Sequence, residues 1–191
     1  MKTSLGAVTL AFPLPAFLVG SYDANGRANI MTAAWGGIAS SDPPCLSVSI
    51  RPSRWSYAAI LANRAFTVSI PDSRLAAAAD YAGLVSGRDH DKFAQAGLTA
   101  VRAEKVNAPY VGESPVAIEC ELYKTLDLGA HTLFVGRIVD VKAEEGLIKS
   151  GGGLDMAGVD PIVFNSGGDY HRVGESVGQA FAIGKSFKSP K

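Results

Sequence analysis

The sequence predicts a mainly β protein in which antiparallel strands build a barrel that carries a few added helices. Segments that alternate apolar with small polar residues recur along the chain, which is the pattern of half-buried strands. Turn signals separate neighbouring segments, so consecutive strands are expected to pair as hairpins. Taken alone, many such strands with few helices indicate a closed barrel.

The expected strands fall mainly into two hairpins. Strands over 16–22 and 29–35 flank a polar turn at 23–26, and long strands over 116–126 and 132–142 flank the tip at 129–131. Single strands are expected over 45–51, 66–70 and 162–165. Helices are expected over 54–63, with Ser53 as the N-cap, and over 73–83, 92–96 and 175–181. Without repeats, a linker or a shift in composition, residues 1–191 are interpreted as one domain.

The bulk composition excludes several classes of partner. Lys+Arg and Asp+Glu both number 18, so the chain lacks the basic excess expected of a nucleic-acid or anionic-membrane binder. A neutral surface also makes oligomerisation easier. Pro13 and Pro15 interrupt the apolar N-terminal stretch, so we expect neither a signal peptide nor a membrane span, and a cytoplasmic location. Cys45 and Cys120 are expected to be buried, reduced thiols.

The segment from Asn29 to Trp35 is the first candidate binding element. Its side chains are small where a strand normally uses bulky residues, which would let a flat ligand approach the backbone N–H and C=O groups. Trp35 adds a large apolar face. A closely packed barrel strand would show the same composition, so both interpretations stay open on the residues alone. The candidate residues are Asn29, Met31, Thr32, Ala33, Ala34 and Trp35.

A second candidate lies where a strand gives way to a helix. Unpaired N–H groups at a helix N-terminus, together with two arginines and several hydroxyls, suit a phosphate group. A capped surface helix with solvated arginines is the alternative. The candidate residues are Ser49, Arg51, Ser53, Arg54 and Ser56.

Three isolated residues complete the candidates. Lys92 would be a cation near an anionic ligand, His131 a donor at a hairpin tip, and Phe164 an aromatic cover beside flexible glycines. The alternatives are a solvated loop for Lys92, a structural or exposed histidine for His131, and core packing for Phe164. Consecutive acidic and histidine side chains at 89–91 rarely converge on one ion, so no metal site is expected.

The chain lacks the signatures of several enzyme classes. G-x-S-x-G and a Ser/His/Asp grouping are absent, which argues against a hydrolase. G-x-G-x-x-G is also absent, so a tightly held dinucleotide is not expected. No catalytic acid or base stands out.

In their order along the chain, these motifs resemble the flavin reductase-like FMN-binding split-barrel family, and within it the flavoredoxin branch. The resemblance runs from Pro13 to Lys185 and rests on N-I-M-T-A-A-W, S-I-R-P-S-R-W-S, D-K-F, G-x-H-T-x-F-V-G and a closing Y-H-R-V-G-E. Ala130 stands where relatives often carry Asp, which puts one polar contact in doubt.

The resemblance implies a Greek-key split barrel that forms a homodimer and binds FMN. By that resemblance, residues 29–35 would line the isoalloxazine, the arginine–serine corner would hold the ribityl and phosphate groups, and Lys92, His131 and Phe164 would contact the flavin. The implied function is electron transfer, with a redox protein or NAD(P)H as the electron donor. The alternatives are an NAD(P)H-dependent flavin reductase that releases reduced FMN, and a non-catalytic split-barrel binding module.

Overall fold

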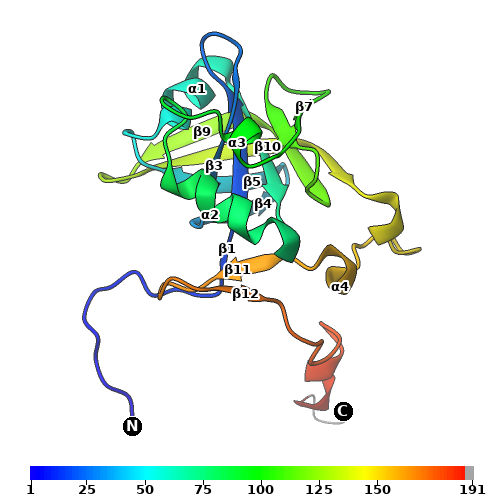
Figure 1. Ribbon diagram of the computed structural model, residues 1–191. Helices are drawn as coiled ribbons and strands as arrows, with labels where there is room; N and C mark the ends of the chain where they lie inside the picture. The colour runs from blue at the N-terminus through cyan, green and yellow to red at the C-terminus, as the bar shows by residue number, and fades with distance from the viewer. Residues whose placement is uncertain (188–191) are drawn as a thin grey trace.

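The computed structural model describes residues 1–187, and its largest element is a seven-stranded antiparallel sheet (Figure 1). In spatial order the strands are β3 (Ala28–Ala33), β2 (Phe17–Tyr22), β6 (Ala65–Ile70), β9 (Val116–Asp127), β10 (Thr132–Ala143), β5 (Pro44–Ile50) and β4 (Gly36–Ser41). Both expected hairpins are present, as β2–β3 and β9–β10. The two edge strands, β3 and β4, follow one another in the sequence.

Strands β3 and β4 stand at the two ends of this hydrogen-bonded order. Within the described chain, β3 forms a ladder with β2 only. The chain bends at Ala34 and Trp35, and a single bond from Ser49 N–H to Trp35 O (2.8 Å) joins the end of β3 to β5. Strands β3 and β5 therefore lie in contact, and the mainly β barrel with added helices that the sequence predicts is confirmed.

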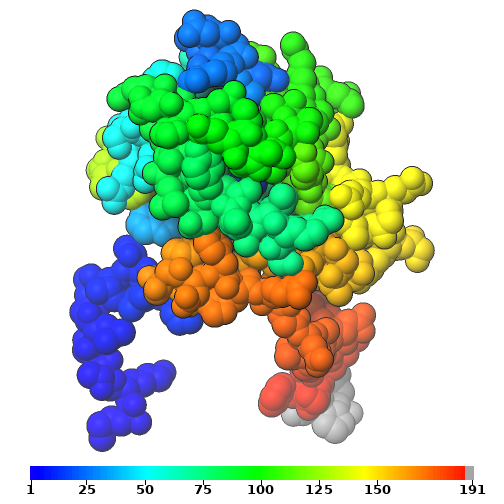
Figure 2. Space-filling model, viewed as in Figure 1, coloured from blue at the N-terminus to red at the C-terminus, as the bar shows by residue number. Residues whose placement is uncertain are grey.

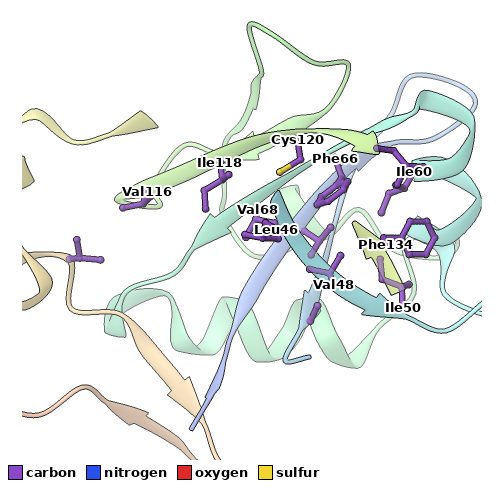
Figure 3. Close-up of a cluster of buried hydrophobic side chains, with 14 residues drawn as sticks. Leu46, Val48, Ile50, Ile60, Phe66, Val68, Val116, Ile118, Cys120 and Phe134 are labelled. Atoms are coloured by element: carbon purple, nitrogen blue, oxygen red, sulfur yellow. The ribbon is translucent and has the colours of Figure 1, made fainter. Parts of the chain in front are cut away.

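The core fills the inside of the curved sheet. Figure 3 shows apolar side chains from β5, β6, β9 and β10 converging with Ile60 of α1. Cys45 and Cys120 are both buried and free, as expected. Burial raises the pKa of the Cys120 thiol to about 12, so this group stays protonated at neutral pH.

Three helices border the site. They are α1 (Trp55–Asn63), α2 (Ala76–Leu84) and α3 (Lys92–Gln95). Ala79 and Ala82 of α2 and Phe93 of α3 pack with Leu18 and Ile30 of the β2–β3 hairpin. This packing brings α2, α3 and the loop between them against β3 (Figure 1).

The remaining elements are short. They are a three-stranded sheet of β1 (Leu14–Pro15), β11 (Ile162–Phe164) and β12 (Tyr170–Arg172), the β7 (Ala100–Arg102) and β8 (Pro109–Val111) pair, α4 (Met156–Val159), and 3-10 turns η1 (Ser73–Leu75), η2 (Glu145–Leu147) and η3 (Ile183–Phe187). The described N-terminal and C-terminal segments leave the barrel as separate extensions (Figure 2). Among residues 1–187, no helix is long and apolar enough to cross a membrane.

Several local expectations are wrong. Ser53 is not an N-cap, because Arg51–Arg54 close a turn and α1 begins at Trp55 with no side-chain cap. The helix expected over 73–83 divides into η1 and α2, with the Asp72 carboxylate accepting from the first backbone N–H groups. Residues 175–181 are not helical. Strand β4 was not predicted, since its glycines and serines lack strand propensity and its partner β5 imposes the extended form.

Candidate functional site

Two adjoining pockets lie along β3. The first, with a volume of about 110 Å³, is lined by Asn29, Met31, Thr32, Ser53, Arg54, Trp55, Ser56, Ala82, Gly83, Val85, Ser86, Gly87 and Lys92. The second, of about 170 Å³, is lined by Met31, Thr32, Ala33, Ala34, Trp35, Ser49, Ile50, Arg51, Arg54 and His131. We call them the inner pocket and the ring pocket. Met31, Thr32 and Arg54 line both, so the two pockets adjoin.

Strand β3 supplies the shared wall. As an edge strand of the described sheet, it has backbone N–H and C=O groups on one side without a strand partner. The Thr32 hydroxyl donates to the carbonyl of Ala79 in α2, so this side chain fixes the helix to the strand. The end of β3 and the small residues Ala33 and Ala34 therefore line the ring pocket.

The first turn of α1 forms the opposite wall of the inner pocket. Ser56 is buried, and its hydroxyl accepts from Asn29 Nδ2 at 2.9 Å, which ties the helix to β3. The carbonyl oxygen Oδ1 of Asn29 and Nε1 of Trp55 are buried with no hydrogen-bond partner among the described residues. Buried polar atoms are almost always paired. Both residues line the inner pocket, so these two unpaired polar atoms lie in its wall, beneath the pocket surface.

Lys92 brings a buried cation to this pocket. It is the first residue of α3 and only 4% exposed, and its Nζ donates to the carbonyl of Ala82 at 2.7 Å. Burial, with a smaller effect from Arg54, lowers the pKa of the Lys92 ammonium to about 8. An anion bound beside this buried ammonium would stabilise its charged form. Lys92 and Arg54, with the Ser53 and Ser56 hydroxyls, make the inner pocket suited to a phosphate.

The ring pocket pairs a flat surface with a neutral imidazole. The rings of Trp35 and His131 lie with centroids 4.7 Å apart, and Trp35 remains 39% exposed. Nε of Arg51 donates to Nε2 of His131 at 3.3 Å, a bond that requires this nitrogen to be unprotonated. Partial burial and then Arg51 and Arg54 lower the pKa of His131, which keeps the ring neutral at pH 7.

The structure brings together every candidate residue from the sequence except Phe164. That side chain lies on β11, in the separate three-stranded sheet, and packs on Tyr170 with ring centroids 5.5 Å apart. Its contact with a flavin stays a prediction. The described residues hold no cluster of three or more His, Cys, Asp or Glu side chains placed to bind a metal ion.

Sequence reasoning missed one wall of the inner pocket. It consists of Trp55 and of the end of α2 with the following loop, namely Ala82, Gly83, Val85, Ser86 and Gly87. The signal was weak, because S-G-R-D after a helix is a common turn composition. Trp55 lies in the motif S-I-R-P-S-R-W-S, where helix propensity alone gives no sign that it borders a pocket.

Comparison with known proteins identifies the family and the fold. The family model described as "Flavin reductase like domain" matches residues 9–172. Flavoredoxin of Desulfovibrio vulgaris (Miyazaki F) is 49% identical, with 97% of this chain and 100% of that chain covered and a TM-score of 0.93. Flavoredoxin from Methanosarcina acetivorans is 30% identical, with 98% of each chain covered and a TM-score of 0.88.

An FMN-binding protein from Thermus thermophilus, solved with bound 1-cyclohex-2-enone, is 29% identical, with 94% of this chain and 97% of that chain covered and a TM-score of 0.78. These likenesses confirm the mainly β split-barrel fold that the resemblance implies. Together with the family model, they show that the chain belongs to the flavin reductase-like domain family.

Proposed function

We propose that this protein binds FMN and transfers electrons, in the manner of a flavoredoxin. The observation that carries the proposal is the inner pocket, where the buried cation Lys92 and the arginine–serine corner lie beside the ring pocket. A ligand with an anionic end and a planar end fits both. The family match and the FMN-binding and flavoredoxin neighbours support the same ligand.

Each wall would hold a different part of the cofactor. Arg54, Lys92 and the hydroxyls of Ser53 and Ser56 would bind the phosphate through charge-assisted hydrogen bonds. The outer edge of β3 would bond the heteroatoms of the ring, and Trp35 would cover apolar ring surface. Bound FMN would supply the electron-transfer chemistry, while these residues bind and orient it. No residue is assigned as a catalytic acid or base.

The principal alternative is an NAD(P)H-dependent flavin reductase that releases reduced FMN. Trp35 is 39% exposed and Arg51 is exposed, so the ring pocket is open enough for exchange. The absorbance spectrum of dialysed protein separates the two proposals. Flavin bands at a stoichiometry of about one per chain support retained FMN. Colourless protein that oxidises NADPH steadily with added FMN supports the reductase, and protein that does neither supports the non-catalytic module.

We further propose that the protein works as a single-domain homodimer in the cytoplasm, with a redox protein or NAD(P)H as its electron donor. Exposed apolar residues on both extensions and on β4 support self-association; among them are Leu10, Phe12, Ile38, Val177 and Phe181. The two free thiols fit a reducing compartment. Light scattering on the protein as it elutes from a size-exclusion column measures its molar mass. The mass of a monomer would contradict the dimer.

Replacing Trp35 with alanine is expected to weaken FMN binding about 3- to 10-fold, because one apolar wall of the ring pocket is lost. Quenching of flavin fluorescence during titration measures the affinity. Tyr123→Ala is the matched control, since Tyr123 is a similarly exposed aromatic on β9 that lines neither pocket. Equal affinity of W35A and the parent protein would show that the ring is misplaced.

A further inference from the structure

The position of residues along β3 gives the site a direction. Ala33, the last residue of β3, and Trp35, two residues later, line the ring pocket. Met31 and Thr32 line both pockets, and Asn29 lines the inner pocket. Successive residues of a strand advance by about 3.3 Å, so these side chains follow one another along the site. A ligand with its flat end at Trp35 and its phosphate near Asn29 points toward the start of the strand, where Arg27 lies just before β3.

The loop between α2 and α3 closes this end of the site. Val85, Ser86 and Gly87 line the inner pocket. At Gly87 a Cβ would collide with Oδ1 of Asn29 and lie 2.8 Å from Cδ1 of Trp55. The loop backbone thus rests directly on the side chains of Asn29 and Trp55, at the Asn29 end of the inner pocket.

Two arginines hold the loop in place. Nη2 of Arg27 donates to the carbonyl of Gly87, and Nε of Arg27 bonds the largely buried Asp23 carboxylate at 3.3 Å. The Arg88 guanidinium lies 5.6 Å from the ring centroid of Trp55, within range of a cation–π contact. The loop is therefore attached to the β2–β3 hairpin on one side and to α1 on the other.

The inner pocket is also small. Pockets that enclose whole ligands of drug size measure about 300–1,000 Å³. At about 110 Å³, the inner pocket takes one group of a ligand, such as a phosphate, and is too small to enclose an adenosine as well. The same loop that supplies Ser86 and Gly87 to the pocket also ends it.

We propose that the loop from Leu84 to Asp91, held by Arg27, restricts the site to the flavin mononucleotide and excludes the dinucleotide FAD. This inference rests on the proposed FMN function and adds the residues that select between the two flavins. Arg27 acts here as a positioning residue, because it contacts the loop and not the ligand.

The test compares the dissociation constants of FMN and FAD for the flavin-free full-length protein, Arg27→Ala, and the control Arg137→Ala. Arg137 is an exposed arginine paired with Glu121 on β9, away from both pockets. We expect the parent protein and R137A to prefer FMN at least about tenfold. We expect R27A to narrow this preference about tenfold by binding FAD better, because the loop loses a hydrogen bond from a charged donor.

Backbone hydrogen exchange over 84–91 provides an independent readout, and we expect it to be faster in R27A than in R137A. If the parent protein binds both flavins equally, the inference is wrong while the flavin function stands. If R27A leaves either the preference or the exchange unchanged, Arg27 does not hold a selecting loop. A parent protein that binds neither flavin contradicts the proposed function itself.

Discussion

Replacing Lys92 with methionine is expected to weaken FMN binding about 10- to 100-fold and to leave riboflavin binding unchanged. Lys92 is the buried cation of the inner pocket, and methionine keeps most of its length and apolar volume. The loss falls on the phosphate alone, because the flat part of the ligand occupies the ring pocket. Titrations of the flavin-free protein with FMN and with riboflavin measure both affinities.

The matched control is Lys124→Met, which removes an exposed lysine on β9 that lines neither pocket. It is expected to bind FMN as the parent protein does. If K92M weakened both flavins equally, Lys92 would be supporting the fold around the site and not binding the phosphate.

The lowered pKa of Lys92 predicts opposite pH dependences for the stability of the flavin-free protein and for its FMN affinity. The pKa of Lys92 is about 8 in the folded protein and 10.5 for an unperturbed lysine, the value expected in the unfolded chain. Between pH 8 and pH 10.5, the unfolded chain therefore binds more protons at this residue than the folded chain does. The flavin-free fold therefore becomes more stable as pH rises from about 8 to 10.5. FMN affinity moves the other way, because phosphate binding favours the protonated ammonium.

Two measurements check this pair of trends. The thermal midpoint of the flavin-free protein gives the stability, and FMN titrations from pH 7 to 10 give the affinity. K92M is expected to flatten both profiles above pH 8, the value near which Lys92 titrates. An unchanged fall in FMN affinity in K92M would assign that fall to another group.

Replacing Gly20 with alanine is expected to destabilise the fold by roughly 3 kcal/mol or more. Gly20 lies in the middle of β2, and a Cβ there would overlap the carbonyl oxygen of Pro109 and lie 2.5 Å from Oγ1 of Thr67. These two atoms form a buried hydrogen bond, which the new methyl group would break. Because the obstacle includes backbone, no side-chain rotation relieves it.

Gly37→Ala is the control for this change. Gly37 also lies in a strand, β4, but no atom lies within 4 Å of the position its Cβ would take. Urea unfolding of the two variants should differ by roughly 3 kcal/mol, since open surface substitutions change stability by about 0.5 kcal/mol or less. Equal midpoints would mean that β8, which contains Pro109, moves away from β2 at little cost.

Most strands were predictable because the period-two pattern is a local property. Alternation in 116–126 and 132–142 located β9 and β10 almost to their ends, and the polar turn at 23–26 joined β2 to β3. Local signals failed where a neighbour decides the conformation. Strand β4 has a low strand propensity and is extended because it pairs with β5. The turn at Arg51–Arg54 delays the start of the helix to Trp55, so Ser53 does not cap it.

For the site, the sequence by itself determined which residue types are available: small side chains over 29–35, the arginine–serine corner, Lys92 and His131. Only the tertiary structure decided that they meet along β3, because residues far apart in the chain become neighbours through packing across the split barrel. It also decided that Lys92 is buried, that Trp55 and the 84–91 loop close the inner pocket, and that Phe164 lies on another sheet. The burial of a side chain and its hydrogen-bond partners depend on the whole fold, so a local sequence pattern does not determine them.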